Sequence, residues 1–106
     1  MKGYLTLYGE RLGEIDFKVI DESMGGIGGR LVPFPAYSKF RDIIQSLYDS
    51  KGVANIDDFE FSIILQGDIS IIPEGGIAVT DSRECDEIYV DSAGVHPDII
   101  SMIRGD

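Results

Sequence analysis

The chain contains one cysteine, Cys85, and one histidine, His96, the side chains best suited to nucleophilic and general-base chemistry. Cys85 lies within the acidic stretch 84–87, where neighbouring carboxylates disfavour the reactive thiolate form. His96 directly precedes Pro97 and fits the start of a short helix, and no sequence pattern connects it with a serine or with the cysteine. We therefore predict that the protein is not an enzyme, and we assign no catalytic residue.

The 19 carboxylates are the other groups suited to chemistry, as metal ligands or as an acid–base pair. Calcium loops place oxygen ligands at every second position around a glycine, and neither 57–60 nor 81–87 has that spacing. A glycosidase-type pair also needs a cleft lined with aromatic side chains, and the chain has no tryptophan. We accordingly predict neither a metal nor a cofactor.

Four glycines fall within the segment Gly25–Gly29. A phosphate-binding loop would place such glycines before a helix and would follow them with a lysine and a serine or threonine. Here Arg30, Leu31 and Val32 follow in the manner of a short strand, which Pro33 ends. We interpret the segment as a bulge, hinge or close approach between strands, with a small-ligand site as the alternative.

The elements that position these residues follow from the hydrophobic pattern. Alternation over residues 4–8 and 14–20 predicts an antiparallel hairpin with one solvated face. Pro35 suits the first turn of a helix expected over 36–50, and Gly52 is a suitable residue to end it. The apolar stripe of this helix comprises Tyr37, Phe40, Ile44, Leu47 and Tyr48, with Ile43 flanking it.

The second half returns to a period of two residues, and a short C-terminal helix is expected to start at His96. The order of strands, helix, strands and short helix shows no dominant βαβ alternation. We predict a single α+β domain over 1–106, with a largely antiparallel sheet and the main helix packed on one face. The expected strands lie at 59–66, Ile69–Ile72, Ile77–Thr80 and Glu87–Asp91.

The net charge is confined to the second half of the chain. Residues 1–52 carry seven basic and seven acidic side chains, whereas 53–106 carry two basic and twelve acidic ones, giving the whole formal charge of −10. Such a field repels nucleic acid and anionic membranes and attracts basic partners. The sequence also lacks a signal peptide or a long apolar run, and its lone cysteine cannot form an internal disulfide, so we expect a cytoplasmic protein.

The acidic residues are either a solvated surface or a docking surface for a basic protein. Alternate loops of an antiparallel sheet fall at the same edge, so the acidic loops of the second half could converge there. Tyr89 would supply the aromatic anchor that interfaces favour. The predicted partner-binding residues are Asp57, Asp58, Glu60, Asp81, Glu84, Asp86, Glu87, Tyr89 and Asp91.

The acidic runs Asp57–Glu60 and Asp81–Asp91, together with the α+β layout, resemble the small acidic immunity proteins of bacterial toxin–immunity systems, including contact-dependent growth inhibition. The resemblance implies a cytoplasmic inhibitor that blocks a cognate basic toxin, often a nuclease, through complementary charge. The alternatives are an adaptor that binds another basic protein and a small-ligand-binding domain that uses Gly25–Gly29. A further possibility is a homodimer, because the edge strands of a half-exposed sheet can pair with those of a second copy.

Overall fold

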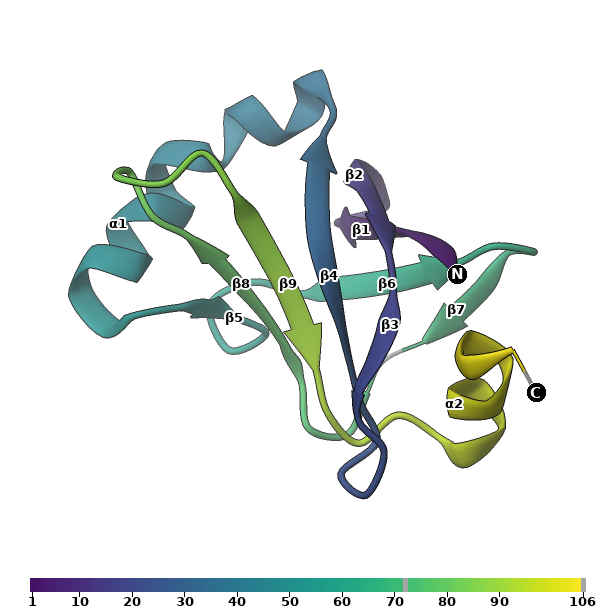
Figure 1. Ribbon diagram of the computed structural model, residues 1–106. Helices are drawn as coiled ribbons and strands as arrows, with labels where there is room; N and C mark the ends of the chain where they lie inside the picture. The colour runs from purple at the N-terminus through teal and green to yellow at the C-terminus, as the bar shows by residue number, and fades with distance from the viewer. Residues whose placement is uncertain (72, 106) are drawn as a thin grey trace.

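An antiparallel sheet dominates the protein, whose computed structural model describes residues 1–71 and 73–105 (Figure 1). The helical segments are the 3-10 helix η1 Pro35–Lys39 and the α-helices α1 Arg41–Lys51 and α2 Pro97–Arg104. This arrangement confirms the predicted α+β class, with one main helix and a short C-terminal helix. The strands are β1 Lys2–Leu7, β2 Glu10–Asp16, β3 Lys18–Asp21, β4 Gly26–Pro33, β5 Ala54–Asn55, β6 Phe61–Leu65, β7 Ile69–Ile71, β8 Ile77–Asp81 and β9 Ile88–Ser92.

Within the described residues the sheet has the order β5-β8-β9-β4-β2-β1-β6-β7, and β3 also pairs with β4. Figure 1 shows β6 running across the direction of β4 and β9, so the sheet curls around its inner face. The predicted first hairpin exists as β1 and β2, but its turn lies at residues 8–9, and the strand expected over 14–20 is divided between the end of β2 and β3, which pairs with β4. The predicted strand Ile69–Ile72 corresponds to β7, and its last residue, Ile72, lies outside the described residues, as does Asp106.

The inner face of the curled sheet holds the hydrophobic core. Along β6 and β8, buried and partly buried side chains alternate, as the two-residue period predicts. Ile44 of α1 is fully buried against this core, and Leu47 is partly buried beside it. The largest fully buried side chains include Phe17, Tyr37, Phe61, Leu5, Leu7 and Leu12.

The main helix differs from the prediction at its start. The expected helix over 36–50 is divided into η1 and α1 at Phe40, whose φ of −113° departs from helical geometry. The backbone N–H of Phe40 donates to the carbonyl oxygen of Tyr37, which is the tighter 3-10 pattern. The C-terminal end is as predicted, because Gly52 adopts the left-handed conformation at φ +85°.

Residues 26–29 lie in the extended strand β4, and Gly25 precedes the strand in a turn with a φ of +63°, in agreement with the structural interpretation of the segment. Residues 26–28 of β4 pair with β3, and residues 27–31 pair with β9 on the other edge. A Cβ atom at Gly29 would lie 2.6 Å from the carbonyl oxygen of Asp16, where the chain bends from β2 into β3. The close strand approach therefore requires glycine at position 29.

Candidate functional site

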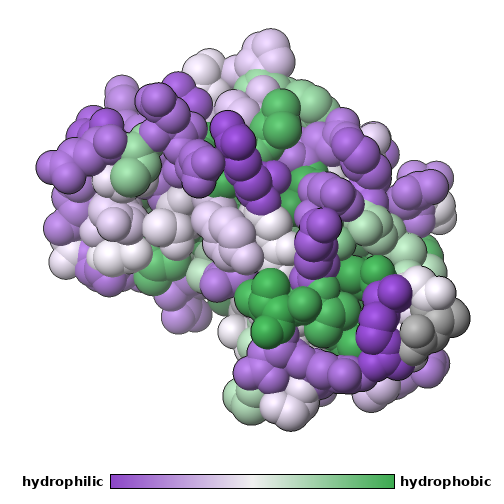
Figure 2. Space-filling model, viewed as in Figure 1, coloured by the Kyte–Doolittle hydropathy of each residue, from purple (hydrophilic) through white to green (hydrophobic). Residues whose placement is uncertain are grey.

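The outward side chains of β3, β4, β8 and β9 form a solvent-facing surface that we call the open face. Along β9, Ile88, Val90 and Ser92 are buried, so alternation directs Tyr89 and Asp91 outward. Ile20 and Val32 also lie here, and their exposed fractions of 51% and 63% are high for apolar side chains. Figure 2 shows hydrophobic atoms gathered on the visible side beside β3 and α2, with hydrophilic residues around them.

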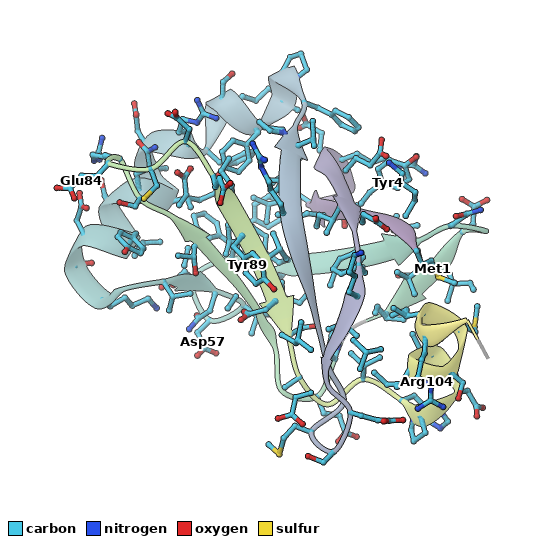
Figure 3. All side chains as sticks on the ribbon, viewed as in Figure 1. Met1, Tyr4, Asp57, Glu84, Tyr89 and Arg104 are labelled. Carbon is cyan, nitrogen blue, oxygen red and sulfur yellow. The ribbon has the colours of Figure 1, made fainter. Side chains whose placement is uncertain are left out.

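Tyr89 occupies a defined place at the middle of the open face (Figure 3). Strand register puts Tyr89 opposite Arg30, two residues along β4 from Gly28. A Cβ atom at Gly28 would lie 2.8 Å from the Tyr89 hydroxyl oxygen and 3.2 Å from two carbons of its ring. The missing side chain at Gly28 therefore leaves the space in which the tyrosine ring rests, while 41% of Tyr89 stays exposed.

A hollow of about 440 Å³ opens on the same face between the end of β3 and the segment that follows β5. We call it the acidic hollow, because Asp21, Asp57 and Asp91 line it. Small residues, Gly26 and Ala78 among them, line the hollow where β4 and β8 contribute to it. These two strands thus contribute no charged side chain to the hollow, and β9, which lies between them, contributes Asp91.

Asp91 is a half-buried carboxylate with no hydrogen-bond or ion-pair partner among the described residues. Burial alone raises its pKa, because the charged form has lost part of its hydration. Asp58 illustrates the opposite case, since its hydrogen bond with Lys51 lowers the pKa of the Asp58 carboxyl. A cation placed in the hollow would give Asp91 the favourable interaction that Asp58 already has.

The other lining carboxylates differ from Asp91. Asp21 accepts hydrogen bonds from the Ser23 hydroxyl at 2.8 Å and from the Met24 backbone N–H at 3.2 Å, so it organises the β3–β4 turn. Asp57 is exposed, and its backbone N–H donates to the Asn55 side chain at 3.0 Å. Glu60 is exposed at the start of β6, outside the lining of the hollow.

The second acidic group is the loop between β8 and β9. Arg83 anchors this loop to α1, where its side chain donates to Asp49 at 3.1 Å and to the Ser46 hydroxyl at 3.1 Å. Glu84 and Asp86 are exposed, and no ion pair of the described residues includes either of them. The loop is thus held in place while its carboxylates face solvent.

Asp81 does not belong to the docking surface that the sequence predicted. It is 2% exposed and accepts hydrogen bonds from the Tyr37 hydroxyl at 2.7 Å and from the Gln45 amide at 3.2 Å. Burial, followed by the hydrogen bond to Asp81, raises the pKa of Tyr37 above its ordinary range, so the phenol remains a donor. Asp81 is buried because alternate side chains of β8 point inward, and Asp81 follows Ile77 and Val79 in that alternation.

The remaining predicted residues form two groups at opposite ends of β8. Asp57 and Asp91 lie at the hollow, near the start of the strand, whereas Glu84 and Asp86 lie beyond its end (Figure 3). Glu87 follows them and faces Arg30 at 3.6 Å. The ends of a five-residue strand are about 13 Å apart at ~3.3 Å per residue. The acidic loops therefore share one side of the molecule without forming one continuous edge.

Sequence reasoning missed the part of the site contributed by the first half of the chain. Asp21 and Met24 line the hollow but lie in a half whose charges cancel. Ile20 could have been noticed in the sequence, because it shares its side of the alternation with the polar residues Asp16 and Lys18. In the structure Ile20 is exposed. Asn55 lines the hollow from β5, which has only two residues and is too short for a periodic signal.

His96 and Cys85, the side chains best suited to nucleophilic and general-base chemistry, lie at a helix start and in a loop. The Nδ1 atom of His96 accepts a hydrogen bond from the backbone N–H of Asp98 at 3.1 Å, which confirms its position as the N-cap of α2. Cys85 is exposed in the β8–β9 loop. Within residues 1–71 and 73–105, no three histidine, cysteine or carboxylate side chains are grouped so as to hold a metal ion.

Comparison with protein-family models, curated proteins and solved structures yields no significant match for this chain. In the described part of the chain, neither helix combines the length and apolar character required to cross a bilayer.

Proposed function

We propose that this protein is a non-enzymatic inhibitor that binds a basic protein, in the manner of bacterial immunity proteins, through the side formed by β5, β8 and β9. The supporting observation is the set of carboxylates there that have no cation within the described chain: Asp57, Glu84, Asp86 and Asp91. Three basic side chains beside this side already have partners: Lys51 pairs with Asp58, Arg83 with Asp49, and Arg30 with Glu87. The basic side chains that form ion pairs elsewhere are Lys2, Arg11, Lys39 and Arg104.

The two acidic groups are compatible with one partner. A standard protein interface covers about 800 Å² on each side, an area wide enough to include both ends of β8, which are about 13 Å apart, together with the residues beside them. Tyr89 lies between them and offers an exposed aromatic ring to the same partner. Unpaired carboxylates at the rim also speed association with a basic surface by electrostatic steering.

The test is an affinity capture from lysate of the source cells at low and at high salt, followed by an inhibition assay on each captured protein. The acidic-side variant neutralises four unpaired carboxylates. A second variant neutralises four carboxylates on other parts of the surface and has the same net charge. The acidic-side variant carries Asp57→Asn, Glu84→Gln, Asp86→Asn and Asp91→Asn, and the control carries Glu10→Gln, Glu22→Gln, Asp68→Asn and Asp98→Asn.

We expect the wild type and the control to retain one basic protein at high salt and to inhibit its activity, and the acidic-side variant to lose both properties. A captured protein whose activity is unchanged would point to an adaptor and would overturn the inhibitor proposal. Equal capture by both variants would show that the acidic side is not the binding surface. Capture of many basic proteins that salt removes would indicate nonspecific attraction, which also contradicts the proposal.

A further inference from the structure

The acidic hollow combines two kinds of surface that one kind of side chain can match. Ile20, Met24 and Ile56 contribute apolar atoms to its lining, and Met24 is 64% exposed. Asp91 contributes a half-buried carboxylate that no described side chain neutralises. An apolar stem that ends in a cation has the complementary structure, and lysine and arginine are the side chains built in this way.

The position of the charge favours this occupant over a wholly apolar one. The carboxylate of Asp91 has lost part of its hydration, and an apolar ligand would remove more of it without compensation. A cation that hydrogen-bonds to the carboxylate replaces the lost water contacts. The formal charge of −10 makes a second copy of this chain a poor occupant, because like charges repel.

We propose that the acidic hollow receives a single lysine or arginine side chain of the partner, whose cationic group pairs with Asp91 while its aliphatic stem contacts Ile20, Met24 and Ile56. This inference rests on the proposed function and names one contact that the protein would make with its partner. Asp57, at the rim, adds a second negative charge near the entering cation. Glu84 and Asp86, at the other end of β8, act on the rate of encounter and not on this contact.

The first test needs no partner, because the arginine side chain can be imitated by n-butylguanidinium and its uncharged counterpart by n-butanol. Each compound is titrated into the full-length isotopically labelled protein, and the NMR signals of the Asp91 carboxyl and the methyl groups of Ile56 and Ala78 are followed. The matched variants are Asp91→Asn, in the hollow, and Asp86→Asn, in the β8–β9 loop, which differ from the wild type by the same charge.

We expect n-butylguanidinium to shift the hollow signals in the wild type and in Asp86→Asn, with affinity at least about tenfold weaker in Asp91→Asn. We also expect the bound cation to lower the pKa of Asp91 towards its ordinary range. Equal shifts with n-butanol would show an apolar pocket and would overturn the inference. Shifts spread over all carboxylates and unchanged in Asp91→Asn would show a diffuse counterion effect, with the same consequence.

The second test uses the captured partner and separates this inference from the proposed function. We expect Asp91→Asn alone to weaken partner binding at least about tenfold, mainly through faster dissociation, and Asp86→Asn to slow association instead. If Asp91→Asn binds as the wild type does while the four-residue acidic-side variant does not, the proposed function stands and this inference fails. If the wild type captures no basic partner, the proposed function itself fails.

Discussion

Replacing Tyr37 with phenylalanine removes one oxygen atom from the interior and leaves the rest of the ring in place. The Tyr37 hydroxyl donates to the Asp81 carboxylate at 2.7 Å, and the two residues are 0% and 2% exposed. A hydrogen bond to a charged group contributes about 1.5–3 kcal/mol to stability, and a buried carboxylate that loses a donor is not rehydrated. We therefore expect Tyr37→Phe to lower the free energy of unfolding by about 1.5–3 kcal/mol.

The assay is urea denaturation followed by far-UV circular dichroism, with thermal unfolding as a second measure. For a domain of this size, 1 kcal/mol corresponds to about 4 °C, so the melting temperature should fall by roughly 6–12 °C. Tyr8→Phe is the matched control, since Tyr8 is 69% exposed, and it should stay within about 0.5 kcal/mol of the wild type. A Tyr37→Phe variant as stable as this control would refute the reasoning.

The same hydrogen bond predicts a dependence on alkaline pH. The pKa of Tyr37 is raised in the folded state, so the stabilisation is complete below the ordinary tyrosine pKa of about 10. Above that pH the unfolded chain releases the Tyr37 proton while the folded protein keeps it, and stability falls as pH rises. We expect Tyr37→Phe to show a shallower alkaline decline than the wild type, and equal declines would contradict the assignment.

Three further substitutions test the site and the strands beneath it. Because burial raises the pKa of Asp91, the contribution of this residue to stability should fall as pH rises from the ordinary aspartate pKa through the raised one. Asp91→Asn should remove that contribution and raise the free energy of unfolding at pH 7, and the difference from the wild type can be measured by urea denaturation at several pH values. Gly28→Ala should displace the Tyr89 ring, visible as NMR shifts of its ring protons, while stability changes by less than about 1 kcal/mol. Ser92→Ala should leave stability unchanged or raise it by up to about 1 kcal/mol in the same urea assay, because the buried Ser92 hydroxyl has no hydrogen-bond partner in the described structure.

The fold was largely predictable wherever side chains carry the periodic signal. The strands β6 to β9 follow directly from alternation, and the end of α1 at Gly52 follows from the helix-ending preference of glycine. Strand β4 was less visible, because glycines add nothing to a hydrophobic pattern, and only its last part reads as a strand. The break at Phe40 accompanies the burial of Tyr37 against Asp81, a contact 44 residues away in the chain that local sequence does not encode.

The candidate site was predictable in its charge and less so in its geometry. The net charge directed attention to Asp57 and Asp91, which line the hollow, yet charge alone does not distinguish them from Asp81, which β8 turns inward. The alternation along β8 could have shown that Asp81 points inward, since Asp81 lies on the same side of the strand as Ile77 and Val79. The contribution of Asp21 could not be foreseen, because it depends on β3 reaching the same side of the sheet as β5.

The attachment of Arg83 to α1 has a consequence for how tightly the β8–β9 loop can bind. A mobile loop loses conformational entropy when a partner immobilises it, and that loss weakens the complex. Here the hydrogen bonds of Arg83 to Asp49 and Ser46 restrict the loop before any partner arrives, so the loss accompanies folding. Arg83 therefore reduces the negative charge of the loop by one, while it preorganises the remaining carboxylates for the partner that we propose.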